Sequence, residues 1–421
     1  MSKILIKGGR VMDPESGLDA VSDVLVEDQD IKEIGRIGPE KDMRVVDATG
    51  LIVIPGVIDL HVHLRDMEQA EKETIETGTK AARKGGVTTV YTMPNTKPPL
   101  SSAAAIKKYR ELLKNARVEV GIIGAITKDL AGRELADFAG YAEPGIKFIS
   151  DDGFDVNDEA LLEQAYKKAM ENDLILVTHP EMDSIGAGGV LNEGEVSRKL
   201  GVPGQPNEKE YKAVERGIRL AMKTGARAHF THISTRESVD LVREAKKTSD
   251  LISCDATPHH FSLTEAEALR VGTLAKVNPP LRTEADRMAI IIGLKDGTID
   301  FIVTDHAPHT EADKSDDFLK AAFGISQLET SLAASITELH FNQGMALMDV
   351  IRLMTLTPSR FAKLRVGRLK AGYPADITLV DLETEKTVDR MSFVSKGKNT
   401  PFHGKKLKGW PVKTIVRGAV Y

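Results

Sequence analysis

Short apolar runs alternate with longer segments of helical periodicity through the middle of the chain. The apolar runs predict eight strands, at residues 51–63, 86–95, 118–127, 145–150, 174–179, 227–233, 251–257 and 299–306. Segments 68–85, 157–172 and 207–225 predict helices between them. Eight strands that alternate with helices predict an α/β fold of the (β/α)8 TIM-barrel type. A doubly wound open sheet is the alternative, but no Gly-rich dinucleotide turn follows the first strand, which favours the barrel.

The two ends of the chain have a different pattern. Residues 1–50, 375–383 and 412–421 alternate apolar and polar positions and are interrupted by Gly, Pro and Asp, which is typical of antiparallel strands. Neither end alone makes a full sheet. We therefore predict a discontinuous β-sandwich domain from residues 1–52 and 366–421, and a barrel domain over residues 53–365.

Composition narrows the class of protein. The 421 residues are 41% hydrophobic and 28% charged with a formal net charge of −5, which gives no sign of a nucleic-acid or membrane-surface binder. The single cysteine, Cys254, excludes an internal disulfide framework and a cysteine-rich zinc module. No signal peptide and no apolar run of the ~20 residues that a membrane helix needs is evident, so we expect a cytoplasmic protein.

A His-x-His pair ends the first predicted barrel strand. His61 and His63 are two residues apart, so their side chains point to one side of that strand. Alone the pair is weak evidence for a ligand site, but His179, His232 and Asp305 end three other predicted strands. In a barrel these ends meet at one mouth. Four histidines and a carboxylate exceed the needs of one tetrahedral zinc and suit two divalent metals.

A pair of metals needs a bridging anion, and residues 145–153, "GIKFISDDG", offer three candidates. Lys147 bridges only if CO₂ converts its amine to a carbamate, whereas Asp151 or Asp152 bridges directly. The alternative is a strand lysine followed by turn acids. Arg65 follows the His-x-His pair on the same predicted face, and its planar guanidinium suits a substrate carboxylate. Its alternative is a surface pair with Asp66.

The combined motifs resemble one known family. "PGVIDLHVHLRD", "TMPNT", "SDDG", "VTHPE", "NPPLR" and "TDHAPH" are similar to the dihydroorotase family of the amidohydrolase superfamily, over nearly the whole chain. The resemblance implies a (β/α)8 barrel, a β-sandwich made from both chain ends, and a zinc enzyme. Such an enzyme interconverts N-carbamoyl-L-aspartate and L-dihydroorotate in de novo pyrimidine synthesis.

The same resemblance implies roles residue by residue. His61, His63, His179 and His232 match the ligands of two zinc ions, and Asp305 matches a ligand that is also the general base and acid for a metal-bridging hydroxide. Asp152 is the favoured bridge, with a carboxylated Lys147 as the alternative. Substrate-binding positions match His63, Arg65, Asn95, Asn278 and His309, with the backbone of Phe323 and Gly324 closing over the ring.

Two other functions stay open from the sequence. Another cyclic-amide hydrolase, such as a hydantoinase, dihydropyrimidinase or allantoinase, shares the ligands but has no use for Arg65. A non-catalytic partner of aspartate transcarbamoylase is the second, and such a partnership is also possible for an active enzyme. Residues 310–322 are polar and predict either a mobile cover over the site or a solvated loop.

Overall fold

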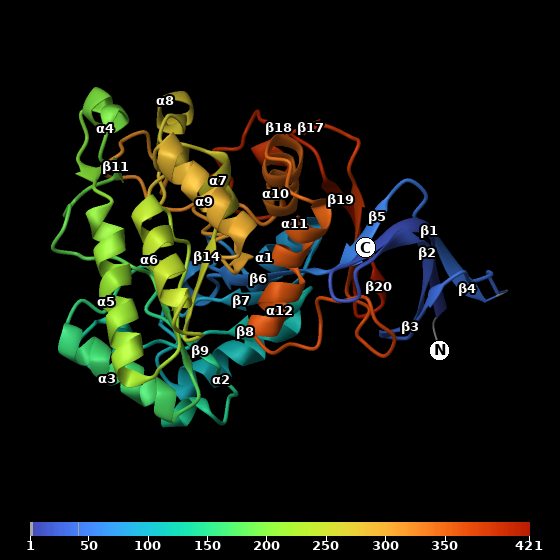
Figure 1. The fold of residues 1–421 in the computed structure, drawn as a ribbon, viewed down its shortest axis with the longest axis horizontal. Coiled ribbons are helices and arrows are strands. Elements are labelled where there is room, and N and C mark those ends of the chain that lie inside the picture. Colours follow the sequence, from blue (N-terminus) through green and yellow to red (C-terminus); the bar gives the residue numbers. More distant parts are fainter. Residues whose placement is uncertain (1–2, 41) are drawn as a thin grey trace.

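The computed structural model describes residues 3–40 and 42–421, so residues 1, 2 and 41 of the predicted terminal domain lie outside the described residues. A β-sheet from the chain ends lies to one side, and parallel strands with surrounding helices make up the rest (Figure 1). Across the described ranges, no helix is both long enough and apolar enough to cross a membrane.

Strands from both chain ends pair in one sheet. Its order is β20-β19-β16-β5-β1-β2-β3, and β4 pairs with β1. Its strands are β1 (Lys3–Asp13), β2 (Leu18–Glu27), β3 (Asp30–Gly35), β4 (Met43–Asp47), β5 (Ile52–Pro55), β16 (Ile377–Asp381), β19 (Trp410–Val416) and β20 (Ala419–Val420). The antiparallel pairing of β5 with β16 joins the two ends. Because β5 runs to Pro55, the sheet crosses the boundary predicted at residue 52. The sandwich form and the domain bounds stay predictions.

Eight further strands are all parallel, and each lies within one of the eight predicted strand segments. They are β6 (Val57–Val62), β7 (Val87–Thr92), β8 (Glu119–Ile122), β9 (Phe148–Ile149), β10 (Ile175–Thr178), β13 (Ala228–Phe230), β14 (Ile252–Ala256) and β15 (Phe301–Ile302). They pair in the orders β6-β7-β8 and β15-β14-β13-β10-β9. Single parallel bridges, Gly124 with Ile149 and Val62 with His306, join the two groups. This mixed α/β arrangement is consistent with the predicted barrel.

Helices follow most of the parallel strands. They are α1 (Ile75–Lys84), α2 (Ala103–Leu112), α3 (Glu159–Glu171), α4 (Glu195–Leu200), α5 (Glu208–Thr224), α6 (Arg236–Lys246), α7 (Pro258–Ser262), α8 (Glu267–Val271), α9 (Glu284–Asp296), α10 (Ser331–Ser335), a π-helix (Ile336–Asn342), α11 (Leu347–Met354) and α12 (Leu356–Phe361). Two short pairs, β11 (Leu191–Asn192) with β12 (Gly204–Gln205) and β17 (Lys386–Thr387) with β18 (Lys406–Leu407), complete the strands. Short 3₁₀ turns cover Met67–Gln69, Leu113–Asn115, Lys128–Leu130, Ala139–Tyr141, Gly272–Ala275 and Arg390–Ser392.

The first predicted helix, 68–85, begins later than its periodicity indicates. The Thr74 side chain accepts a hydrogen bond from the Thr77 backbone N–H at 3.1 Å and starts α1 at Ile75. Such an N-cap is worth about 1 kcal/mol of helix stability. The residues before it are therefore free to form the loop that leaves β6.

Helix α5 packs closely on strand β13, and this contact supports the strand that leads to His232. Gly217 faces the ring of Phe230, and a Cβ at residue 217 would lie 2.5 Å from Phe230 Cε1. Phe230 is fully buried, so its ring has no free space to move into. A glycine in mid-helix costs about 1 kcal/mol relative to alanine, and here it permits the close approach.

We predict that Gly217→Ala lowers the free energy of unfolding by about 1–3 kcal/mol, because overpacking outweighs the gain in helix propensity. The control is Met222→Ala on the same helix, where the side chain is 40% exposed and little change is expected. Chemical denaturation of both variants measures the effect. A Gly217→Ala protein as stable as the parent contradicts the packing argument.

Candidate metal centre

Six side chains meet where parallel strands end. His61 lies in β6 and His63 directly follows that strand, while His179 follows β10 and His232 lies two residues beyond β13. Asp152 and Asp305 come three residues after β9 and β15. All six are buried. The ends of parallel strands share one edge, so residues far apart in the chain become neighbours there.

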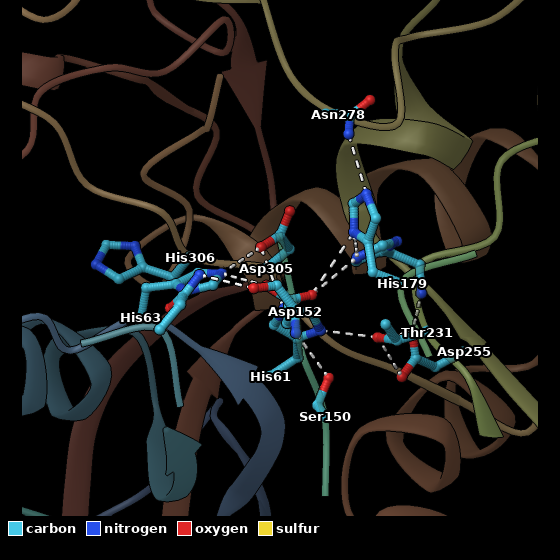
Figure 2. A network of polar contacts seen from close by, with 12 residues as sticks. His61, His63, Ser150, Asp152, His179, Thr231, Asp255, Asn278, Asp305 and His306 are labelled. Atoms are coloured by element: carbon cyan, nitrogen blue, oxygen red, sulfur yellow. Dashed lines mark hydrogen bonds and ion pairs between the residues drawn. The ribbon is translucent and has the colours of Figure 1, made fainter. Parts of the chain in front are cut away.

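Figure 2 shows the Asp152 carboxylate among the side chains of His61, His63 and His179. Its oxygens lie 3.3 Å from His61 Nε2 and 3.3 Å from His63 Nε2. The same carboxylate lies 3.7 Å from His179 Nδ1 and 3.5 Å from His232 Nε2. Asp305 approaches from the other side, with Oδ1 3.0 Å from His63 Nε2 and 3.4 Å from His61 Nε2.

The ligand atoms divide into two groups that share Asp152. One is His61, His63 and Asp152, and the other is Asp152, His179 and His232; within each, the ligand atoms lie within 4.8 Å of one another. His61 Nε2 and Asp152 Oδ1, which face each other, are buried and have no hydrogen-bond partner. Unpaired buried polar atoms are costly unless something binds them. The donor set of imidazoles and carboxylates therefore fits two divalent cations with a carboxylate between them.

Three of the histidine rings are held in orientation by a contact of the ring nitrogen that does not face Asp152. His61 Nδ1 lies 2.7 Å from Thr231 Oγ1, which donates in turn to Asp255. His63 Nδ1 lies 2.8 Å from Asn95 Oδ1. These contacts leave Nε2 of both rings free to face the carboxylates, as is usual for metal-binding histidines.

The third ring, His179, is held by Glu181. The Nε2–H of His179 donates to Glu181 Oε2 at 3.0 Å, so its Nδ1 faces Asp152. Lys209 pairs with the other oxygen of Glu181. Sequence reasoning missed Glu181, Thr231 and Asp255. An acid near a strand end was the available signal, but the sequence does not distinguish such an acid from a turn residue.

The charges of the cluster are strongly coupled. Burial lowers the pKa of His61, but the adjacent Asp152 and Asp305 outweigh burial and raise it to about 9. Burial raises the pKa of Asp152, but His61 and the hydrogen bonds from the histidines hold it well below its usual range. A cation bound here would compete with a proton on His61, so metal binding is expected to weaken as the pH falls.

Lys147 does not lie in this cluster. It is exposed and precedes β9, whereas Asp152 follows that strand. The two residues therefore belong to opposite ends of the same strand, and only the carboxyl end carries the histidines. The position of Lys147 therefore favours Asp152 as the bridge, and that choice stays a prediction. Asp151 is also occupied elsewhere, since it accepts hydrogen bonds from the Ile126 and Thr127 backbones.

A pocket of about 130 Å³ opens onto the cluster. Its lining includes His63, Arg65, Asn95, Asp152, Gly153, His179, His232, Asn278, Asp305, Ala307, Phe323 and Gly324. Almost all of the predicted substrate-binding residues therefore share one cavity with the predicted ligands. Gly324 has a φ of 138°, and a Cβ there would lie 2.8 Å from the Ala307 carbonyl oxygen, so the close approach of this wall requires glycine.

Arg65 faces this pocket for a reason other than strand alternation. β6 ends at Val62, and Arg65 has a φ of 54° in the loop beyond it. The side chain is buried, and its Nε has no hydrogen-bond partner. Burial lowers the pKa of the guanidinium, while Asp305 and Asp152 act in the opposite direction. The alternative, a surface pair with Asp66, is absent from the described residues, where Asp66 instead accepts hydrogen bonds from the Met67 and Ile75 backbones.

The remaining predicted residues lie at the edge of the pocket. Asn95 already uses both ends of its amide, because Nδ2 donates to the Asp152 carbonyl oxygen while Oδ1 faces His63. Asn278 Nδ2 donates to Glu181 Oε2. His309 adjoins Gly324, and its pKa falls to about 3 through burial and the charges of Arg65, Lys72 and Lys314. Its imidazole is therefore neutral at physiological pH.

Comparison with known proteins agrees with this geometry. The model of the Amidohydrolase family matches residues 52–420, and the chain belongs to this family. A dihydroorotase from Elusimicrobium minutum is 42% identical over 417 residues, which cover 99% of this chain and 96% of the relative. A dihydroorotase from Pelotomaculum thermopropionicum is 43% identical over 418 residues, covering 99% and 98%. The resemblance predicted from the motifs is confirmed.

Solved structures with the same fold include other cyclic amidohydrolases. The L-hydantoinase (dihydropyrimidinase) from Arthrobacter aurescens has a TM-score of 0.89 at 26% identity, covering 100% of this chain and 96% of that one. A dihydropyrimidinase from Brevibacillus agri has a TM-score of 0.87 at 23% identity, covering 99% of this chain and 94% of that one. At this identity the likeness supports the fold alone.

We predict that Arg65→Met leaves the free energy of unfolding within about 1 kcal/mol of the parent or raises it, because it removes a buried charge whose Nε is unpaired. The control is Arg282→Met. Arg282 is equally buried but donates to Ser234, Asn192 and the Gln205 carbonyl oxygen. Its loss is expected to cost about 3 kcal/mol. If denaturation curves show that Arg65→Met and Arg282→Met are destabilised equally, the distinction between the two arginines is refuted.

Proposed function

We propose that the protein catalyses the reversible cyclisation of N-carbamoyl-L-aspartate to L-dihydroorotate, a step of pyrimidine (UMP) biosynthesis. The observation that carries this proposal is Arg65, a buried guanidinium in the pocket that holds the histidine and aspartate cluster. Both compounds carry a carboxylate, which suits a guanidinium. The dihydroorotases that are similar over the whole chain support the same reaction.

We also infer the finer architecture. The bridge between Gly124 and Ile149 and the bridge between Val62 and His306 support a closed ring of the eight parallel strands. The proposed fold is thus a (β/α)8 barrel over about residues 53–365, with a β domain from residues 1–52 and 366–421. Its carboxyl edge carries the pocket, as in other barrel enzymes.

Two zinc ions would suit the centre, where Asp152 belongs to both groups of possible ligands. His61 and His63 would hold one ion and His179 and His232 the other. When bound, such ions lower the pKa of a coordinated water to about 7 and polarise a carbonyl oxygen. Zinc fits because imidazole nitrogen and carboxylate oxygen are its usual ligands in proteins.

The residues of the chain divide the remaining work. Burial raises the pKa of Asp305, but the hydrogen bond to His63 and the charge of His61 outweigh burial and hold this pKa below its usual range. The Asp305 carboxylate is therefore ionised and able to take a proton. Asp305 would return that proton to the ring nitrogen when the amide opens. Arg65 would bind the carboxylate and fix the ring, while Phe323 and Gly324, which line the same pocket, would help to exclude water.

Other readings are weaker. A hydantoinase or related cyclic amidohydrolase is the first alternative, because the L-hydantoinase from Arthrobacter aurescens has a similar fold. Its neutral substrate gives Arg65 no partner. A purely structural partner would have no need of six converging ligand residues. An association with aspartate transcarbamoylase and the cytoplasmic location stay predictions.

Substrate choice tests the function. The zinc-loaded protein is expected to turn over L-dihydroorotate at least about a hundred-fold faster than hydantoin or allantoin, expressed as kcat/KM. Arg65→Ala is expected to abolish that preference by loss of the carboxylate contact. Arg236→Ala is the control, because this side chain is 61% exposed on α6. Better turnover of hydantoin that is insensitive to Arg65→Ala would overturn the assignment.

Metal content tests the bridge. The parent protein is expected to retain two equivalents of zinc by elemental analysis after dialysis, and Asp152→Ala to lose one or both, because the carboxylate serves both groups of ligands. Lys147→Ala is the matched control and is expected to keep both, with no response to added bicarbonate. Zinc loss in Lys147→Ala with retention in Asp152→Ala would reverse the assignment of the bridge.

A further inference from the structure

One wall of the pocket is a loop, residues 310–324, that we call the cover segment. Phe323 and Gly324 at its end line the pocket, while Leu319 near its middle is 62% exposed. Only short turns occur in it, so neither a helix nor a strand explains how it keeps its shape. Something else must hold it against the pocket.

Two buried lysines hold the cover segment from inside. Lys314 Nζ donates to the carbonyl oxygens of Lys276 at 2.9 Å, Ala322 at 2.8 Å and Gly324 at 3.2 Å. An ammonium has three N–H donors, so Lys314 uses all of them on backbone carbonyls. Two of these carbonyls belong to the same loop as Lys314 itself.

Lys276 completes this arrangement from outside the segment. Its Nζ donates to the carbonyl oxygens of Phe318 and Ala321 and lies 4.3 Å from the centre of the Phe323 ring. Its backbone carbonyl also accepts from the Gly324 N–H at 3.1 Å. The residues that face the pocket are therefore tied to the Lys276 backbone and side chain.

Neither lysine forms an ion pair within the part of the chain that the structure describes. Burial and the neighbouring Lys276 lower the pKa of Lys314 from 10.5 to about 7, and burial also lowers the pKa of Lys276. Placing two ammonium groups here is costly, and a methionine would fill similar space without that cost. An ammonium, however, offers three N–H donors to backbone carbonyls, which a methionine cannot replace.

We propose that Lys314, together with Lys276, is a positioning residue that fixes the cover segment so that Phe323 and Gly324 present a preformed wall to the substrate. Neither lysine lines the pocket, so both act through the backbone they hold. The substrate then binds without first ordering a loop. This inference deepens the proposed dihydroorotase function, on which its kinetic test rests.

The experiment uses full-length, zinc-loaded Lys314→Met and Lys276→Met. For Lys314→Met, KM for dihydroorotate is expected to rise about ten-fold, equal to ~1.4 kcal/mol of binding, with kcat within about three-fold of the parent. Amide hydrogen exchange in residues 310–324 is expected to quicken by a similar factor, with the parallel strands unchanged. The matched control is Lys320→Met in the same segment, whose side chain is 80% exposed and pairs only with Asp317.

Three results overturn the proposal: unchanged KM and exchange in both variants, a loss of kcat at constant KM, or faster exchange throughout the molecule. If Lys314→Met does not fold, Lys276→Met decides by the same two measurements. If the parent fails to turn over dihydroorotate, the proposed function falls. Hydrogen exchange then still decides whether the lysines hold the segment, because that readout needs no turnover.

Discussion

The buried carboxylate of Asp152, surrounded by four imidazoles, is the interaction on which the rest of the centre depends. A negative charge there attracts the histidines that would otherwise repel one another when protonated. Asp152 lies three residues beyond β9, a strand of only two residues. Parallel pairing sets the ends of β9, β10 and β13 level, and single bridges join this group of strands to the group that contains β6.

Around this centre, further buried carboxylates orient the histidines and the loops that carry the ligands. Asp255 accepts from the His232 backbone and from Thr231, and it also pairs with His229 Nε2 at 2.8 Å. Asp59 accepts from the Thr304 N–H and its hydroxyl, next to Asp305. His232 and Asp305 both have positive φ values, a conformation that costs energy outside glycine. These carboxylates help to offset that strain and fix both residues.

The sequence predicts the parallel strands, and which polar side chains meet at their ends, because both depend on local pattern. Buried parallel strands are continuous apolar runs, and His61, His63, His179, His232 and Asp305 stand at their ends. Lys147 and Asp152 are only five positions apart in sequence, yet they lie at opposite ends of β9 because that strand is so short.

Other features depend on three-dimensional contacts that no local pattern encodes. Glu181 accepts hydrogen bonds from His179 and from Asn278, and Asn278 lies 97 residues from Glu181 in the chain. The burial of Lys314 also escapes prediction, because a lysine in a polar loop is typical of a solvated surface. Arg65 faces the pocket through a left-handed backbone turn rather than through strand alternation.

The terminal sheet also constrains the order of folding. Strand β5 hydrogen-bonds to β16, whose first residue, Ile377, lies opposite Pro55. During synthesis at ~5–20 residues per second, the apolar β5 edge would remain unpaired for roughly 15–65 seconds before its partner is made. An exposed apolar edge invites pairing with other nascent chains. The late synthesis of the final strands therefore leaves this apolar edge without its partner until most of the chain has been made.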